Sequence, residues 1–152
     1  MGRVETVLRS LGLDLPQAKP PVANYLGTKQ SGHQLFVAAR VSHQQGVVGD
    51  SISLEQAQVA ARDTLLQLLA IIKADISDLD KICSVVKLQG FVRSAPDFVA
   101  QPQVIDGASD LLVALYGEAG RHARTATGTS QLPYGAAIQL DILVELGEPP
   151  LV

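Results

Sequence analysis

The sequence has little cysteine, few aromatic residues and no excess of positive charge. Cys83 is the single cysteine among 152 residues, which excludes an internal disulfide and a metal site built from several cysteines. Aromatic residues make up 4% of the chain and the net charge is −3, so a basic or stacking surface for nucleic acid is not supported and we expect no nucleic-acid partner. Because Cys83 begins a predicted strand and nothing in the sequence lowers its pKa, we interpret it as a small core residue.

Long hydrophobic runs and metal-binding motifs are also missing. The longest apolar stretch, residues 65–74, is interrupted by two polar side chains and is shorter than the ~18 residues that span a bilayer. The first ten residues contain no hydrophobic region of the kind found in signal peptides. His33, His43 and His122 do not have the spacing of metal ligands. We therefore expect a cytoplasmic protein with no membrane partner and no bound metal.

What is present is a composition typical of a folded globular domain. Hydrophobic residues make up 47% of the chain and charged residues 18%. A chain of this length can bury a substantial core without a disulfide or metal. We expect one domain over residues 1–152, in which residues 1–20 form an N-terminal helix with a proline-rich extension and residues 21–146 form the core.

Hydrophobic periodicity predicts both helices and strands. The predicted helices cover residues 4–11, 54–74 and a segment within 97–116, best formed over 108–116 because Pro102 disturbs its first half. Ser53 and Gln56 have the spacing of a capping box at the start of the second helix. The predicted strands are 24–30, 34–41 and 82–92, followed by a hairpin of 123–132 with 137–146.

The order of these elements predicts the fold class. Two main amphipathic helices and a mixed, mostly antiparallel sheet make an α+β two-layer sandwich with the helices on one face of the sheet. Val86, Leu88, Gly90 and Val92 are predicted to share one side of their strand. The opposite face of the sheet must then be polar or covered by another subunit.

Arg124 stands out in the last predicted hairpin, which carries few other charges. Strand alternation places it on the same face as Ala126, Gly128 and Ser130, all of which are small. Small neighbours would leave a concavity above the sheet, in which a planar guanidinium can hold a carboxylate through two parallel hydrogen bonds. From the residues alone, a solvent-facing arginine on an edge strand is still the favoured interpretation.

Four short motifs favour the carboxylate-binding interpretation of Arg124 instead. They are Pro-Val-Ala-Asn-Tyr at 21–25, Phe-Val-Arg-Ser-Ala-Pro-Asp-Phe at 91–98, Ala-Arg-Thr at 123–125 and Leu-Pro at 132–133. With these motifs the chain resembles a divergent branch of the YjgF/RidA family, the reactive intermediate or imine deaminases that are also called L-PSP endoribonuclease-like. The resemblance extends over about residues 20–146 and includes the order of the elements.

The resemblance implies a chorismate mutase-like (RidA-like) fold assembled as a homotrimer with clefts between subunits. It also implies hydrolysis of reactive enamines and imines, of the 2-aminoacrylate type, to 2-keto acids and ammonia, with no cofactor. The expected ligands are small 2-imino or 2-keto carboxylic acids.

The resemblance also assigns roles to individual residues. Arg124 matches the arginine that binds the substrate carboxylate, Tyr25 matches a tyrosine that lines the pocket, and Ala39 stands where backbone faces the substrate. Asp106 is the nearest counterpart of a polar pocket residue, and Gln139 replaces an acidic catalytic residue. An amide can orient a water molecule but cannot accept its proton, and general-base help is worth ~10²–10⁴ in rate.

Several interpretations therefore stay open. Asp141 lies two residues beyond Gln139 on the same strand face and could replace the missing acid. Gln139 and the Ala-Ala-Arg segment 38–40 favour a non-catalytic trimer that binds small carboxylic acids as a sensor or scavenger. Ribonuclease activity is disfavoured by the low basicity, and Arg124 could instead brace a subunit interface.

Overall fold

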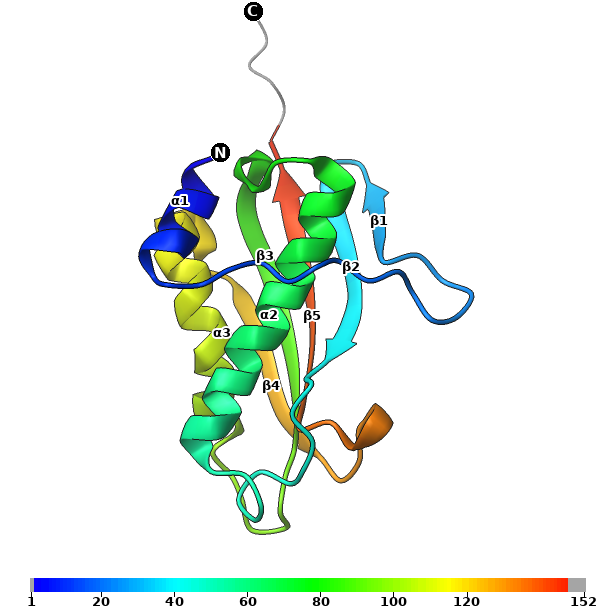
Figure 1. Ribbon diagram of the computed structural model, residues 1–152, viewed down its shortest axis with the longest axis vertical. Coiled ribbons are helices and arrows are strands. Elements are labelled where there is room, and N and C mark those ends of the chain that lie inside the picture. Colours follow the sequence, from blue (N-terminus) through cyan, green and yellow to red (C-terminus); the bar gives the residue numbers. More distant parts are fainter. Residues whose placement is uncertain (1, 148–152) are drawn as a thin grey trace, which may run out of the picture.

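The computed structural model describes residues 2–147 and contains one five-stranded sheet with its long helices on one face (Figure 1). This arrangement confirms the predicted α+β class. The helices are α1 (Arg3–Ser10), α2 (Leu54–Ile76) and α3 (Gln101–Tyr116), with short 3-10 turns η1 (Leu79–Lys81), η2 (Gly117–Gly120) and η3 (Pro133–Gly135). The strands are β1 (Thr28–Ser31), β2 (Gln34–Val41), β3 (Ile82–Arg93), β4 (Ala123–Thr129) and β5 (Ile138–Leu146).

The strand order is β1-β2-β5-β3-β4, and every neighbouring pair is antiparallel except β3 with β4. The predicted hairpin of 123–132 with 137–146 is therefore wrong, because β3 lies between β4 and β5. Helix α3 carries the chain from β3 to a parallel β4 at the sheet edge, and η3 then returns it to β5 inside the sheet. Alternation of hydrophobic residues fixes which face a strand buries, but it does not fix the partner of that strand.

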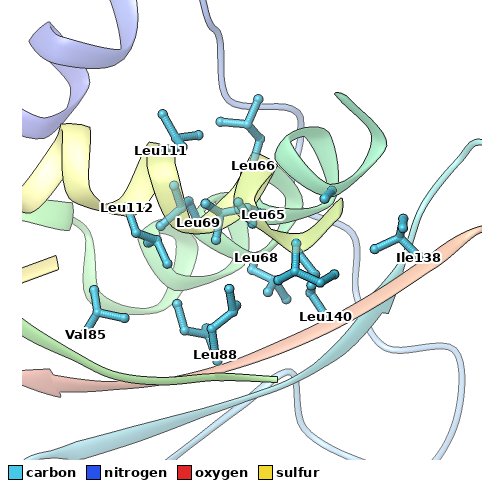
Figure 2. Close-up of a cluster of buried hydrophobic side chains, with 14 of the residues drawn as sticks. Leu65, Leu66, Leu68, Leu69, Val85, Leu88, Leu111, Leu112, Ile138 and Leu140 are labelled. Carbon is cyan, nitrogen blue, oxygen red and sulfur yellow. The ribbon is translucent and has the colours of Figure 1, made fainter. Parts of the chain in front are cut away.

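Helix α2 begins at the predicted capping box. Gln56 N donates to Ser53 Oγ at 3.1 Å, and Ser53 N donates to Gln56 Oε1 at 2.9 Å. Its buried side packs against α3 and the sheet. Figure 2 shows this core, with Leu65, Leu66, Leu68 and Leu69 of α2, Leu111 and Leu112 of α3, Val85 and Leu88 of β3, and Ile138 and Leu140 of β5.

Helix α3 is longer than predicted because Pro102 lies in its first turn. A proline there removes no intrahelical hydrogen bond, so the expected disturbance does not occur. Gly107 lets α3 approach α2 closely, since a Cβ built on it would lie 2.1 Å from the carbonyl oxygen of Gln58.

Two predictions about β3 are corrected near the start of the strand. The register shifts between Val85 and Lys87, so that Val85 is buried and Val86 is only partly buried. An extra residue in one strand changes which residues face inward on one side of the irregularity. A prediction that assumes strict inward–outward alternation along the strand therefore fails there. Cys83 is exposed rather than in the core, because its buried neighbour Ile82 takes the inward position.

The face of the sheet opposite the helices carries polar and mixed side chains. Gln139 and Asp141 on β5 and Gln89 on β3 alternate with buried residues and are partly buried themselves. Phe36 on β2 is 47% exposed. Within residues 2–147, no helix has both the length and the apolar character needed to cross a membrane.

Candidate functional site

Arg124 lies on the edge strand β4, where it pairs with the buried Leu88 of β3. Its side chain is therefore directed to the helix-covered side of the sheet, and it is 24% exposed. Nη1 donates to Asp106 Oδ1 at 2.7 Å and to Ser109 Oγ at 3.2 Å, both on α3. Arg124 is thus held by two side chains, and it is not a freely solvated arginine.

The small residues that follow Arg124 do not leave the expected concavity. A Cβ on Gly128 would lie 2.8 Å from the side-chain nitrogen of Gln101, and Ala126 packs against the core. Small side chains on this face make room for α3 to lie close to the strand. The expectation of a hollow above β4 is therefore wrong at these positions.

The guanidinium keeps one edge available for a ligand. Both hydrogen bonds that orient it use Nη1. Among residues 2–147, no hydrogen bond uses Nε or Nη2 of Arg124. These two donors form the planar edge that matches the two oxygens of a carboxylate.

Sequence reasoning missed two neighbours of Arg124. Nε2 of His122 lies 2.9 Å from Ser109 Oγ, and Nδ1 of the same ring lies 2.6 Å from the carbonyl oxygen of Gly120. Ser109 and His122 are thirteen residues apart, on α3 and in the short link between η2 and β4. The only signal in the sequence was the closeness of His122 to Arg124, since no motif connects it to a serine in the middle of a helix.

Of the predicted site residues, the structure brings Asp106 into contact with Arg124. The others lie in parts of the fold away from Arg124 of the same chain. Tyr25 lies in the segment before β1 and is 43% exposed. β1 and β4 are the two opposite edges of the sheet, as Figure 1 shows. Ala39 lies in the irregular part of β2, where the register shifts between Val37 and Arg40.

Gln139 lies on β5 between Val41 of β2 and Phe91 of β3. It alternates with the buried Ile138, so its side chain is on the face opposite the helices, whereas Arg124 faces them. One chain therefore cannot direct both side chains into the same cleft.

Asp141, the other candidate acid, is on the same face as Gln139 and pairs with Gln89. Burial raises the pKa of its carboxyl, and the positive charge of Lys87 offsets part of that effect. A carboxylate whose pKa is raised is a stronger base when it is ionised, so the shift does not argue against Asp141, but its side chain lies on the face that Arg124 of the same chain does not face.

A groove at the other side of the molecule also carries positive charge. One part of it has a volume of about 310 Å³ and is lined by residues that include Lys19, Arg40, His43 and Tyr134. Nη2 of Arg40 donates to the carbonyl oxygen of Lys19 at 2.8 Å, while its buried Nε has no partner in the described part of the chain. This groove lies along β2 and α2, away from the edge strand that carries Arg124.

The side chains of the described residues do not form a metal site. Across residues 2–147, no group of three or more histidine, cysteine, aspartate or glutamate residues is arranged to hold a metal ion. The chemistry available around Arg124 is therefore that of a guanidinium, a carboxylate, a hydroxyl and an imidazole.

Comparisons with known proteins place the chain in a family. Residues 5–146 match the family described as "YjgF/chorismate mutase-like, putative endoribonuclease". Protein TCP17 of Trypanosoma cruzi is 43% identical over 152 residues, which cover 95% of each chain. The solved structure of Atu1372 from Agrobacterium tumefaciens, a protein of unknown function, is 40% identical with a TM-score of 0.89 and covers 95% of this chain and 92% of its own.

A second solved structure, from Shewanella oneidensis MR-1, carries the same endoribonuclease description. It is 27% identical with a TM-score of 0.91, and the match covers 95% of this chain and all of the other. The family match spans nearly the whole chain and agrees with the motifs that first indicated the resemblance. The chain therefore belongs to the YjgF/chorismate mutase-like family.

Proposed function

We propose that this protein hydrolyses reactive enamines and imines of small 2-amino acids to 2-keto acids and ammonia, as the resemblance to RidA-type deaminases implies. The observation that carries the proposal is the hydrogen bonding of the Arg124 guanidinium. Asp106 and Ser109 fix its guanidinium through Nη1, which leaves the Nε–Nη2 edge for a substrate carboxylate. A fixed carboxylate places the neighbouring imine carbon at a defined position next to the same side chains.

The proposal requires a site shared between subunits. Tyr25 precedes the edge strand β1, whereas Arg124 lies on the opposite edge strand β4. Gln139 is on the sheet face that Arg124 does not face. We infer that a homotrimer brings Arg124 of one subunit to Tyr25, the Ala39 backbone and Gln139 of its neighbour.

In this arrangement each residue has a limited task. Arg124 binds the carboxylate, Tyr25 packs on the short side chain, and Gln139 orients the attacking water through its amide. The family's endoribonuclease description is not the function we propose, because a chain with a net charge of −3 offers little attraction for a polyanion.

The test couples the purified protein to a pyridoxal phosphate-dependent dehydratase and follows decay of the released imine. We expect faster decay than in buffer, and we expect Arg124→Ala to abolish the acceleration. The variant Arg40→Ala, which removes a partly buried arginine from the groove that Lys19 and His43 also line, serves as the matched control and should keep the activity. Decay at the buffer rate with the wild-type protein would reject the deaminase.

A second candidate function is favoured by Gln139, which cannot act as a base. A trimer that only binds small carboxylic acids would then serve as a sensor or scavenger. Calorimetry with pyruvate and 2-ketobutyrate separates the two cases. Binding that depends on Arg124, without imine hydrolysis, selects the sensor, and absence of binding removes both functions.

A further inference from the structure

Arg124 is the first member of a hydrogen-bonded chain whose direction is fixed by chemistry. A backbone carbonyl can only accept, so Nδ1 of His122 must carry the proton that it shares with Gly120 at 2.6 Å. In the neutral ring, Nε2 then presents its lone pair to the hydroxyl of Ser109 at 2.9 Å. The Ser109 oxygen in turn accepts from Nη1 of Arg124 at 3.2 Å.

The position of Gly120 makes this orientation of His122 rigid. A Cβ on Gly120 would lie 2.3 Å from the carbonyl oxygen of Leu112, so its backbone is pressed against α3. The carbonyl that holds the ring therefore belongs to a segment that has little room to move. A base whose second nitrogen is held by a fixed acceptor is the arrangement that general-base catalysis requires.

We propose that Ser109 and His122 form the proton-accepting pair of this site, replacing the acid that the family has at the position of Gln139. This inference rests on the proposed deaminase function. The pair lies beside the group that would hold the substrate carboxylate, on the same chain and on the same side of the sheet. Asp141 lies on the opposite face of its own chain and would reach this site only from a neighbouring subunit.

The reaction needs no reactant other than the protonated imine and water. A water oxygen forms a bond to the carbon of the protonated imine, and the C=N electron pair moves to nitrogen. The water proton passes to Ser109 Oγ while the serine proton passes to Nε2 of His122, which gives a neutral carbinolamine and an imidazolium. The imidazolium then returns its proton to the amine through Ser109. The C–N bond breaks with its electron pair moving to nitrogen, and the hydroxyl becomes the keto group as its proton passes through Ser109 and His122 to the released ammonia. The products are the 2-keto acid and ammonium.

Ser109 contacts the reacting water in this scheme, whereas His122 acts through Ser109. His122→Gln is the informative variant, because the glutamine oxygen can still accept a hydrogen bond but cannot take up a proton. We expect kcat to fall by about 100-fold or more. Affinity for 2-ketobutyrate, measured by calorimetry, should stay within about twofold, because the bonds of Arg124 to Asp106 and Ser109 are kept.

His43→Gln is the matched control, since it makes the same change at an exposed histidine. A second variant, His122→Gly, leaves space for added imidazole. We expect imidazole to restore its activity in a saturable manner, with stronger bases restoring more. A role of His122 in folding alone would not produce that dependence.

The outcomes separate this inference from the proposed function. Wild-type protein without deaminase activity would overturn both. An active wild type together with a fully active His122→Gln variant would overturn the pair and leave the deaminase in place. Loss of both activity and 2-ketobutyrate binding in His122→Gln, without rescue of His122→Gly by imidazole, would likewise overturn the pair.

Discussion

Asp106 and a bound carboxylic acid would compete for the same guanidinium. The Asp106 side chain is 45% exposed, and its oxygen lies 2.7 Å from Nη1 of Arg124. Its negative charge therefore orients Arg124 but also repels an anionic ligand at the free edge. Two unit charges 4 Å apart in a water-like medium interact by about 1 kcal/mol, which is the appropriate scale for so exposed a group.

Replacing Asp106 by asparagine keeps the hydrogen-bond acceptor and removes the charge. We expect Asp106→Asn to bind 2-ketobutyrate about fivefold more tightly, as that energy implies. Isothermal titration calorimetry measures the change directly, with the exposed and distant Asp97→Asn as control. Weaker binding by Asp106→Asn would mean that orientation of Arg124 matters more than repulsion.

Asp141 gives the protein a predictable dependence on pH. Because the pKa of its carboxyl is raised in the folded state, the folded protein binds more protons than the unfolded chain in the range between the two pKa values. The stability contributed by this group therefore falls as pH rises through that range, which starts near 3.9, the ordinary aspartate value.

Asp141→Asn removes this dependence. We expect the free energy of unfolding of the variant, relative to wild type, to increase from about pH 3 to pH 7, as measured by urea denaturation. A difference that does not change over that interval would show that Asp141 is not destabilised by burial.

At this scale the sequence drew attention to Arg124 and, through the family resemblance, to Asp106. Their hydrogen bond is observed, and their roles toward a substrate stay predictions. The proximity of Ser109 and His122 depends on where α3 passes β4, and no local pattern encodes that distance. The burial of Cys83 was mispredicted although strict alternation with Leu88 and Val92 already places it on the other face of β3; the shift of register affects Val86 instead.

Among the elements, α3 determines the geometry of the site, because it supplies both Asp106 and Ser109. Its distance from the sheet is set by small side chains. Gly107 faces the backbone of α2, and Gly90 faces Ile105, whose Cδ1 would lie 2.6 Å from an added Cβ. These glycines allow α3 to lie where its polar side chains reach Arg124.

Gly107→Ala tests this close approach. Alanine favours a helix over glycine by about 1 kcal/mol, but its Cβ would lie 2.1 Å from the Gln58 carbonyl oxygen. Backbone atoms cannot rotate away, so we expect a net loss of about 1–3 kcal/mol in the free energy of unfolding. Chemical denaturation checks the value against Asp110→Ala, an exposed position of the same helix. A variant as stable as wild type would contradict the packing of α2 against α3.

The elements themselves were largely predictable and their pairing was not. The capping box and the apolar spacing of α2 are local signals, and both appear in the structure. The error was the hairpin of 123–132 with 137–146, since the Leu-Pro turn has the composition of a hairpin loop. The chain instead passes from the edge strand β4 to β5 inside the sheet, and β3 lies between these two strands.

For the whole molecule, the position of Tyr25 and Arg124 at opposite edges has a direct consequence. If the site is shared between subunits, then Tyr25→Ala and Arg124→Ala are defective in different halves of it. Each variant alone should be inactive in imine hydrolysis. After unfolding and refolding as an equal mixture, about one quarter of the sites would join two intact halves.

We therefore expect the refolded mixture to recover about one quarter of wild-type activity. Mixing without refolding, which leaves the oligomers unchanged, is the control. Light scattering should show a trimer for both variants and for the mixture. A mixture as inactive as its components would place both residues in one chain's own site, or outside the site.

The central claim is that Arg124 holds the carboxylate of a small acid where two subunits meet. A crystal structure with bound 2-ketobutyrate tests it most directly. We expect the carboxylate on Nε and Nη2 of Arg124, with Tyr25 of a neighbouring subunit beside the ligand. The acid bound only in the groove of Lys19 and Arg40, or Arg124 bound to Asp106 with no second subunit nearby, would contradict the account.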